Sequence, residues 1–330
     1  MIFAAVLGLA MGLLSAPAAE AAASATCTWT PTAWEMPSGA DLATVDGYDG
    51  SRYAVGVTGK RPPWGGGIAE PRGTVWDNGK VVLRLPDEVP HLRDVNSAGL
   101  AVGDDVVNDK FIAVAVSVGG KVTPLARDPK WDSYSAWLVN NAGDIVGFAS
   151  AGNKEVLVVW PGKAPGTYRE LPVPNVDYLH LTDVDEQGRI VAQTDSGSGG
   201  GFVWDTDGQW RVLTAQGTGA YGTPFAIRNG RMVGSANDDT SYAAAEWDAR
   251  GRLVRTIRGG ATEAVAIGGN GTVGGYRFVG SEQRLVLWRD GKVVDPLTAV
   301  SWAFRLVGIS DDERTLFGVE SGRPTQYRCS

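Results

Sequence analysis

A short motif of apolar and polar positions recurs along most of the chain. Each copy has an apolar pair, a polar turn and a second apolar run that usually ends in Gly. Apolar runs on both sides of a Gly-containing turn predict an antiparallel hairpin. The copies span residues 95–103, 139–147, 184–192, 227–234 and 267–275, with looser copies at 53–56 and 315–318.

A second marker follows in the repeated units, although the second and seventh units lack its Trp, and it predicts a second hairpin. It is an apolar run that ends in Trp and leads into a turn with Gly, as in Trp76-Asp77-Asn78-Gly79. The two markers together define a unit of about 40–47 residues with four short strands, which is typical of a propeller blade. Seven units predict an all-β, seven-bladed β-propeller. The Trp of this marker stands at positions 76, 160, 204, 247 and 288, where we expect packing between blades.

The two ends of the chain predict how the ring closes. The seventh unit offers three strands, near 305–309, 315–320 and 325–329, so the N-terminal segment 27–36 is expected to supply the outer strand of the last blade. Cys27 and Cys329, the only two cysteines, lie on these segments. In an oxidising compartment they are expected to form a disulfide, and two unpaired structural cysteines are the alternative.

The repeated units resemble a known family. The pattern apolar-Asn-x-x-Gly-x-apolar-Val-Gly, followed by a strand that ends in Trp and a Gly turn, is similar to the HAF repeats of bacterial extracellular proteins. The resemblance covers about residues 45–330, although the His-Ala-Phe tripeptide itself is absent. It implies an extracellular propeller and does not imply a particular reaction.

The N-terminal residues predict export. An apolar run at 2–14 precedes Ala23-Ser24-Ala25, a small-x-small cleavage pattern. We expect residues 1–25 to be a signal peptide and residues 26–330 to be a secreted propeller. The run is too short to span a membrane, which takes about 20 apolar residues, and no other run is long enough.

Charge and composition narrow the function classes. A net charge of −7 argues against a nucleic-acid partner. Two His and two Cys are too few for a His-rich or Cys-rich metal cluster, so we expect no metal and no cofactor. We also expect a monomer.

Two weak motif signals do not change the expectation of no cofactor and no metal. The G-x-G-x-x-G at 217–222 lacks a surrounding βαβ unit, and the acidic group Asp104, Asp105, Asn108 and Asp109 lacks a calcium-loop spacing.

Aromatic residues outside the repeat positions predict a binding face. In a propeller the connections between blades share one face with the connections between the second and third strands. Exposed rings there, interleaved with charged residues, suit a protein or glycan partner; the alternative for each ring is folding back onto the blades. The long insertion 57–73 carries one of them. The candidates are Trp64, Trp131, Tyr134, Tyr178, Tyr221, Tyr242, Tyr276 and Trp302.

A second set of candidates lies at equivalent positions of the second and fourth units. His91 and Asp94, like His180 and Asp183, belong to an innermost strand near the predicted channel mouth. Such groups could form an acid–base pair or a metal site, but a structural role repeated by duplication is the alternative. The sequence favours an exported binding module. An extracellular lyase or glycan hydrolase with a channel-mouth site is the second hypothesis, and a scaffold without a small-molecule ligand is the third.

Overall fold

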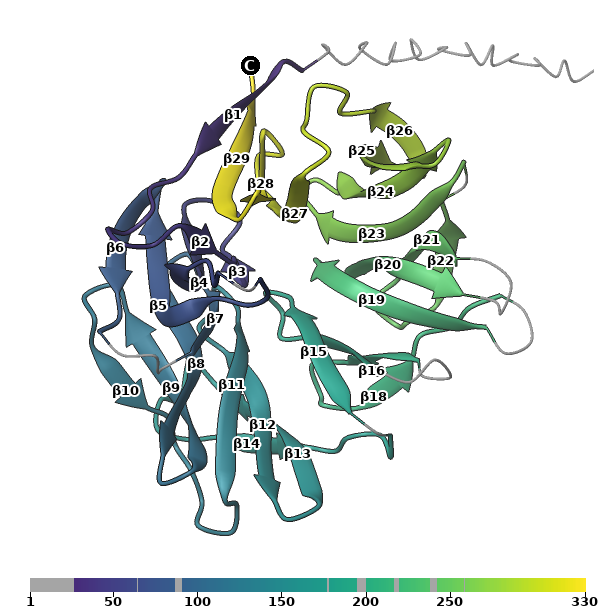
Figure 1. The fold of residues 1–330 in the computed structure, drawn as a ribbon. Coiled ribbons are helices and arrows are strands. Elements are labelled where there is room, and N and C mark those ends of the chain that lie inside the picture. Colours follow the sequence, from purple (N-terminus) through teal and green to yellow (C-terminus); the bar gives the residue numbers. More distant parts are fainter. Residues whose placement is uncertain are drawn as a thin grey trace, which may run out of the picture.

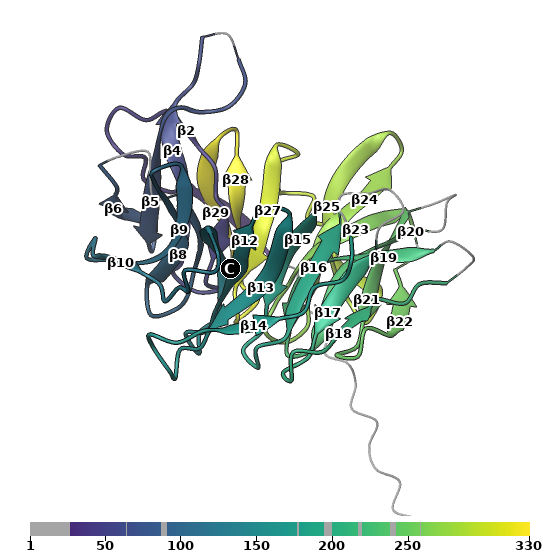
Figure 2. The ribbon, with the colours of Figure 1, turned by 90° about the horizontal axis from the view of Figure 1, so that it is seen from below.

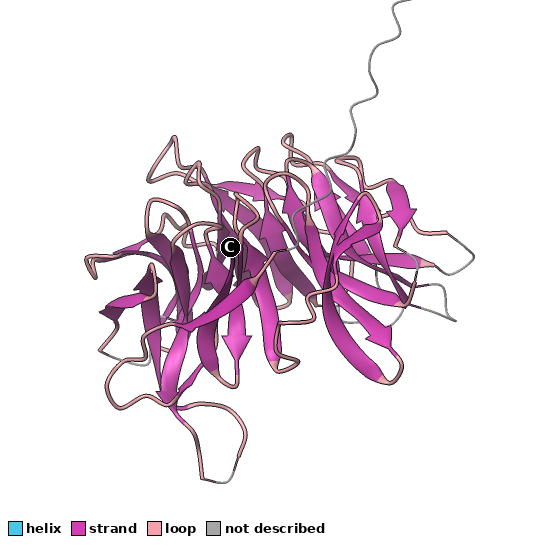
Figure 3. Ribbon diagram, turned by 90° about the horizontal axis from the view of Figure 1, so that it is seen from above, coloured by secondary structure: helices cyan, strands magenta, loops and turns pink. Residues whose placement is uncertain are grey.

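The computed structural model describes residues 27–330 apart from 64, 87–90, 177, 195–199, 217–219, 238–241 and 258. Its strands form antiparallel sheets arranged in a ring (Figure 1). The described residues contain strands and loops and no helix (Figure 3). Seven sheets are formed by this part of the chain, which confirms the predicted propeller.

In each blade the innermost strand faces the central axis and the following strands pair outward in chain order. Blade 1 differs because two short strands, β2 and β3, share its inner edge. Blades 1 and 2 consist of β2 (Leu42–Ala43), β3 (Gly47–Tyr48), β4 (Tyr53–Lys60), β5 (Ala69–Asp77) and β6 (Lys80–Arg84), then β7 (His91–Val95), β8 (Leu100–Val107), β9 (Lys110–Ser117) and β10 (Val122–Pro124).

The middle blades repeat this order with four strands each. Blades 3 and 4 consist of β11 (Ser133–Val139), β12 (Ile145–Ala151), β13 (Lys154–Trp160) and β14 (Arg169–Leu171), then β15 (Leu179–Val184), β16 (Ile190–Thr194), β17 (Gly201–Trp204) and β18 (Trp210–Val212). Blades 5 and 6 consist of β19 (Tyr221–Arg228), β20 (Arg231–Asn237), β21 (Tyr242–Trp247) and β22 (Leu253–Thr256), then β23 (Ala261–Ile267), β24 (Val273–Val279), β25 (Glu282–Arg289) and β26 (Lys292–Asp295).

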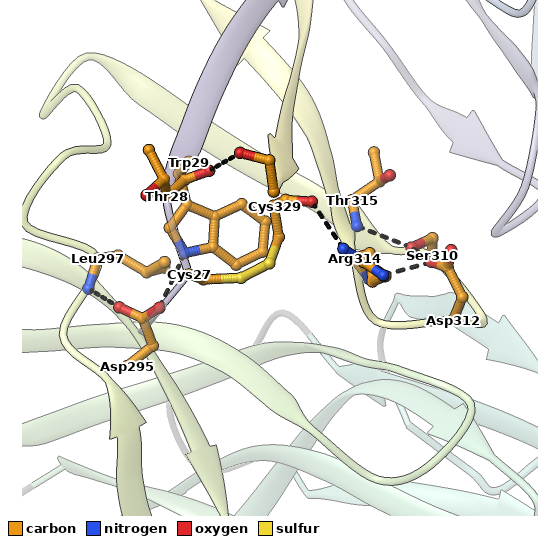
Figure 4. The surroundings of a disulfide bond; sticks show 11 residues. Cys27, Thr28, Trp29, Asp295, Leu297, Ser310, Asp312, Arg314, Thr315 and Cys329 are labelled. Atoms are coloured by element: carbon orange, nitrogen blue, oxygen red, sulfur yellow. Dashed lines mark hydrogen bonds between the residues drawn. A yellow bond between two sulfur atoms is a disulfide. The ribbon is translucent and has the colours of Figure 1, made fainter. Parts of the chain in front are cut away.

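The N-terminal strand completes the last blade, as predicted. Blade 7 contains β27 (Phe304–Ile309), β28 (Thr315–Glu320) and β29 (Arg323–Cys329), and β1 (Trp29–Ala33) pairs antiparallel with the outer side of β29. The predicted disulfide joins Cys27 to Cys329 across 302 residues of chain, with the two Cα atoms 5.2 Å apart (Figure 4). The Trp29 indole beside it donates a 2.8 Å hydrogen bond to Asp295 of blade 6. The first and last strands are therefore bound to each other and to the neighbouring blade.

The core consists of seven apolar clusters of described residues, one at each interface between neighbouring blades. The repeated tryptophans are buried in these clusters, which confirms the prediction of packing. Four of their indoles also donate to a backbone carbonyl on the segment that leaves the outer edge of the preceding blade. The pairs are Trp76 with Glu35, Trp160 with Ala126, Trp204 with Pro172, and Trp247 with Thr214.

The Gly that ends the first motif lies opposite a bulge in the innermost strand. In blades 2–7 the pairing of this strand with its neighbour shifts by one residue. A Cβ at Gly103 would collide with the carbonyl oxygen of His91, and one at Gly147 with that of Ser135. Only Gly allows two backbones to approach so closely. Blade 4 is the exception and has Ala192.

Two predicted turns and one insertion are visible as expected. Asn78-Gly79 and Asp290-Gly291 have positive φ at both positions, as a two-residue hairpin turn requires. The β4–β5 hairpin extends beyond the other blades on one face (Figure 2).

The predicted signal peptide, residues 1–25, lies outside the described residues, as does Trp64. In the described part of the chain, no helix has the length and apolar character to cross a membrane.

Candidate functional site

The inner strands enclose a central cavity of about 180 Å³. The bulge residues of blades 2 and 4–7, together with Asp46 on the inner edge of blade 1, contribute to its wall, and blade 3 contributes Leu138. Blades 1, 2 and 4 supply polar residues, whereas blades 5, 6 and 7 supply apolar ones. These wall residues are Asp46, Arg93, Thr182, Phe225, Val265 and Val307. At the bulges the wall is therefore polar on one side and apolar on the other, and Arg228 of blade 5 also lines the cavity.

Arg93 is held on two sides. Its guanidinium donates to both carboxylate oxygens of buried Asp104, at 3.0 and 3.3 Å, and lies 4.0 Å from the centre of the Trp137 ring. The acidic group noted in the sequence is therefore not one cluster. Asp104 pairs with Arg93, whereas Asn108 and Asp109 form the β8–β9 hairpin turn. No group of three or more His, Cys, Asp or Glu residues in the described ranges is arranged to hold a metal ion.

Asp94 and Asp183 connect neighbouring blades. Each carboxylate accepts one hydrogen bond from the following backbone amide and one from the inner strand of the next blade. For Asp94 the acceptor oxygens lie 2.8 Å from the nitrogens of Val95 and Val139. For Asp183 the distances are 2.7 Å to Val184 and 2.8 Å to Ile227. Both carboxylates therefore satisfy buried amides of the channel wall.

Burial changes the protonation of both carboxyls. It raises the pKa of Asp94 to about 8 and that of Asp183 to about 7, although the amide hydrogen bonds lower both pKa values. The charges of Asp183 and Asp49 raise the pKa of Asp94 further, whereas Arg228 lowers that of Asp183. The charge of Asp183 therefore contributes to the raised pKa of Asp94.

The two histidines do not join these carboxyls around one cavity. His91 begins β7 and His180 is the second residue of β15, both half-buried and neither in the wall of the central cavity. Burial raises the pKa of Asp46 in blade 1 and that of Glu155 in blade 3, and the nearby His91 and His180, respectively, partly oppose these shifts. Each histidine thus acts on a carboxyl of the preceding blade.

The aromatic candidates are distributed around the ring and differ in exposure. Tyr178, Tyr242 and Trp302 are exposed, Trp131 and Tyr221 are half-buried, and Trp64 lies outside the described residues. Trp131 packs against the core cluster between blades 2 and 3 and donates a 2.8 Å hydrogen bond to Glu170. The Tyr221 hydroxyl accepts from Asn237.

For two of the candidates, the expectation of exposure was wrong. Tyr134 has 3 % of its surface exposed and Tyr276 has 7 %. Both lie within inner or second strands, on the side that faces the adjacent blade, and their hydroxyls accept backbone amides: Tyr134 that of Asp128, and Tyr276 that of Leu306. These two tyrosines are core residues.

Trp302, 75 % exposed, borders a groove between blades 6 and 7. The groove has a volume of about 350 Å³, and a second hollow of about 310 Å³ adjoins it along Gln283, Arg284 and Trp302. Its wall combines the β24–β25 end with the connection from β26 to β27, which belong to the predicted face. Apolar side chains of the floor include Tyr276, Leu285, Leu297, Val300 and Phe304, all in one buried cluster that also contains Trp29.

The connection that forms this wall is anchored to the closure of the ring. Asp295 accepts the Trp29 indole through one oxygen and the backbone amide of Leu297 through the other, both at 2.8 Å (Figure 4). The Ser301 amide donates to the hydroxyl of Tyr327 in β29. The groove therefore depends on the N-terminal strand for its shape.

Charged residues surround Trp302, and most of them are cationic. Arg277 of β24 lies directly opposite Arg284 of β25, and both line the groove. Arg284 forms an ion pair with Glu282, and Arg305 donates a 3.1 Å hydrogen bond to the Trp302 carbonyl. The Arg277 side chain has neither a hydrogen bond nor an ion pair in the described part of the chain, and its Nε is buried.

Sequence reasoning missed these arginines. The only available signal was the pattern around the β24–β25 turn, where Arg277 follows an apolar residue and Arg284 precedes one, at matching distances from Gly280-Ser281. Without the register of the hairpin, the two arginines could not be placed opposite each other, nor beside Trp302.

Comparisons with known proteins support the fold. No family model and no curated protein matches the sequence. Among solved structures, the chain is similar to virginiamycin B lyase from Staphylococcus aureus (TM-score 0.56, 11 % identity, 92 % of this chain and 99 % of that one). It is also similar to the propeller domain of the Trilobed protease from Pyrococcus furiosus (TM-score 0.56, 11 % identity, 87 % and 94 %).

A prolyl endopeptidase is similar as well (TM-score 0.57, 13 % identity, 79 % of this chain), but the chain spans only 42 % of that protein. At these identities the likeness concerns the fold alone. The Trilobed protease propeller has an open velcro topology, whereas here β1 pairs with β29 and a disulfide joins the two ends.

Proposed function

We propose that this protein is an exported binding module that holds a glycan or protein partner in the groove between blades 6 and 7. The observation that carries the proposal is Trp302, a large aromatic ring 75 % exposed between two adjoining hollows. An exposed indole offers a partner a large apolar face together with a polar N–H edge. Around it, Gln283, Arg284 and Arg305 offer hydrogen-bonding groups, as binding sites commonly do.

Export is part of this proposal. A disulfide that joins the two ends of the described chain suits an oxidising compartment, and residues 1–25 have the pattern of a signal peptide. The resemblance of the repeats to HAF-repeat proteins of the bacterial exterior supports the same location. We propose membership of that family on the repeat motifs, and a monomeric state.

The enzymatic alternative requires ionisable groups that are free to act on a substrate in the channel. Asp94 and Asp183 each accept two backbone amides, and the histidines act on carboxyls elsewhere. These contacts favour a structural role for the four residues, in the wall of the channel.

The proposal is tested by comparing two exposed aromatic residues of the same face. Trp302→Ala and Tyr178→Asn each remove an exposed ring; Asn suits the positive φ of 52° at Tyr178. The mature chain and both variants are assayed by biolayer interferometry against neutral polysaccharides, acidic polysaccharides and acidic and basic polypeptides. We expect one class to bind, with a loss of about tenfold or more in Trp302→Ala only. Equal binding by Trp302→Ala and the wild type would contradict the proposal.

A further inference from the structure

We infer that the groove between blades 6 and 7 binds an anionic polysaccharide, with a sugar ring on Trp302 and the acidic group of the sugar on Arg277 and Arg284. This inference rests on the proposed binding function and names its ligand class. It is carried by the arrangement of the arginines, which the aromatic ring alone does not explain.

The first step is the like-charge pair across β24 and β25. Arg277 and Arg284 are directly opposite in the antiparallel register. Like charges in such positions repel and destabilise the sheet. Glu282 neutralises Arg284 only, since Arg277 has no ion pair in the described residues. An anion between the two guanidinium groups would remove the repulsion.

The second step is the state of Arg277 itself. Its Nε is buried without a hydrogen-bond acceptor. A guanidinium stays charged at any physiological pH and has five N–H donors, so a buried donor without a partner is costly. The planar group matches carboxylate, sulfate or phosphate oxygens in a bidentate manner. Arg277 and Arg284 both line the groove, so an anion held there lies beside both side chains.

The third step is the local charge. The groove and the adjoining hollow are lined by Arg277, Arg284, Arg305 and one carboxylate, Glu282. This local excess of positive charge contrasts with the net charge of −7 for the whole chain. Non-specific adsorption of a polyanion to an acidic protein is disfavoured. Binding of a polyanion would therefore report a specific site.

The fourth step separates a saccharide from an acidic peptide. Trp302 presents an exposed apolar face, which suits the C–H face of a sugar ring, and its edge is surrounded by planar polar side chains. Glu282 and Gln283 can accept and donate hydrogen bonds to hydroxyl groups. An acidic peptide would use the arginines but would leave these hydroxyl-binding groups and the flat indole with less suitable partners.

The experiment measures affinity of the mature chain for soluble polymers that differ in charge and backbone. Alginate and polygalacturonate carry carboxylates, dextran sulfate carries sulfates, dextran is neutral, and poly-glutamate is the peptide. Arg277→Gln is compared with Arg250→Gln, which removes an exposed arginine in the β21–β22 turn. Arg277→Lys retains the charge without the planar fork.

We expect an anionic polysaccharide to bind, with a loss of about tenfold in Arg277→Gln and a smaller loss in Arg277→Lys. Trp302→Ala should also lose binding, and Arg250→Gln should not. Raising NaCl from about 50 to about 500 mM should weaken binding to the wild type, because screening is stronger; this readout does not depend on how well a variant folds. Comparison of the carboxylated and sulfated polymers then identifies the anionic group.

Three results would overturn the inference. If dextran binds as well as alginate, and Trp302→Ala loses both while Arg277→Gln loses neither, the proposed function stands and the anionic ligand is wrong. If poly-glutamate alone binds with the same dependence on Arg277, the occupant is an acidic peptide. If anionic polymers bind equally to Trp302→Ala, Arg277→Gln and the wild type, both the inference and the proposed function fail.

Discussion

The central channel and the groove between blades 6 and 7 both contain charged groups, but these groups differ in how far they are satisfied. In the channel, Asp94 and Asp183 each accept two backbone amides. In the groove, Arg277 has no acceptor in the described chain and Trp302 is exposed. Groups whose hydrogen bonds are complete stabilise the fold, and incomplete groups are available to a ligand. The comparison favours the groove as the binding site, although the channel contains more of the residue types that suggest catalysis.

The largest effect is expected at the ring closure that supports the groove. Replacing Cys27 and Cys329 by Ser should lower the free energy of unfolding by about 5 kcal/mol, because the disulfide closes a loop of several hundred residues in the unfolded chain. Urea unfolding measures the change. The reduced wild-type protein is the matched control and should agree with the double variant. If the double variant is as stable as the oxidised protein, the closure is held by strand pairing alone.

A smaller loss of stability is expected in the channel wall. Asp94→Ala leaves the buried amides of Val95 and Val139 without an acceptor, which should cost about 2–4 kcal/mol of unfolding free energy. Asp94→Asn keeps one acceptor oxygen and should lose less. Polysaccharide binding at the groove should be unchanged in both. Loss of binding with unchanged stability would reverse the roles of the two regions.

The same carboxyl predicts a pH dependence of stability. The pKa of Asp94 is raised from 3.8 to about 8 by burial, so between these values the folded state binds more protons than the unfolded state. The free energy of unfolding should therefore fall by a few kcal/mol as pH rises from about 4 to about 8. Asp94→Asn should have a shallower pH profile than the wild type. An identical slope in the two proteins would contradict the raised pKa.

The smallest effect on stability is expected in the groove. Trp302→Ala removes an exposed ring and should change the unfolding free energy by no more than about 0.5 kcal/mol. Thermal or urea unfolding of this variant checks the expectation, with Tyr178→Asn as the control on the same face. A large destabilisation would mean that Trp302 packs onto the blade, and its role in binding would then need another explanation.

Much of the fold was predictable because the repeat is local. The Gly of the first motif reports a close approach of two strands within a blade, as at Gly103, and the Trp of the second motif reports a contact with the preceding blade, as at Trp204. The disulfide was predictable because only two cysteines exist and the ring brings both ends together.

The site was less predictable because exposure and pairing depend on neighbouring blades. Tyr276 and Trp302 were both assigned to connections on the predicted binding face. The Tyr276 hydroxyl nevertheless accepts the backbone amide of Leu306 in β27, whereas the Trp302 side chain is exposed to solvent. Arg277 was not a candidate, since nothing in its local sequence indicates that Arg284 faces it.

The sequence by itself determined the all-β class, the number of blades, the tryptophan packing and the partners at the closure of the ring. These follow from periodicity, turn chemistry and composition, which act over a few residues or repeat in every unit. Only the tertiary structure decided that the carboxylates Asp94 and Asp183 are occupied by amides and that the Arg277 side chain of blade 6 has no acceptor among the described residues. The physical reason is that hydrogen-bond saturation depends on which backbone and side-chain atoms lie within about 3 Å, and those atoms come from blades that are distant in sequence.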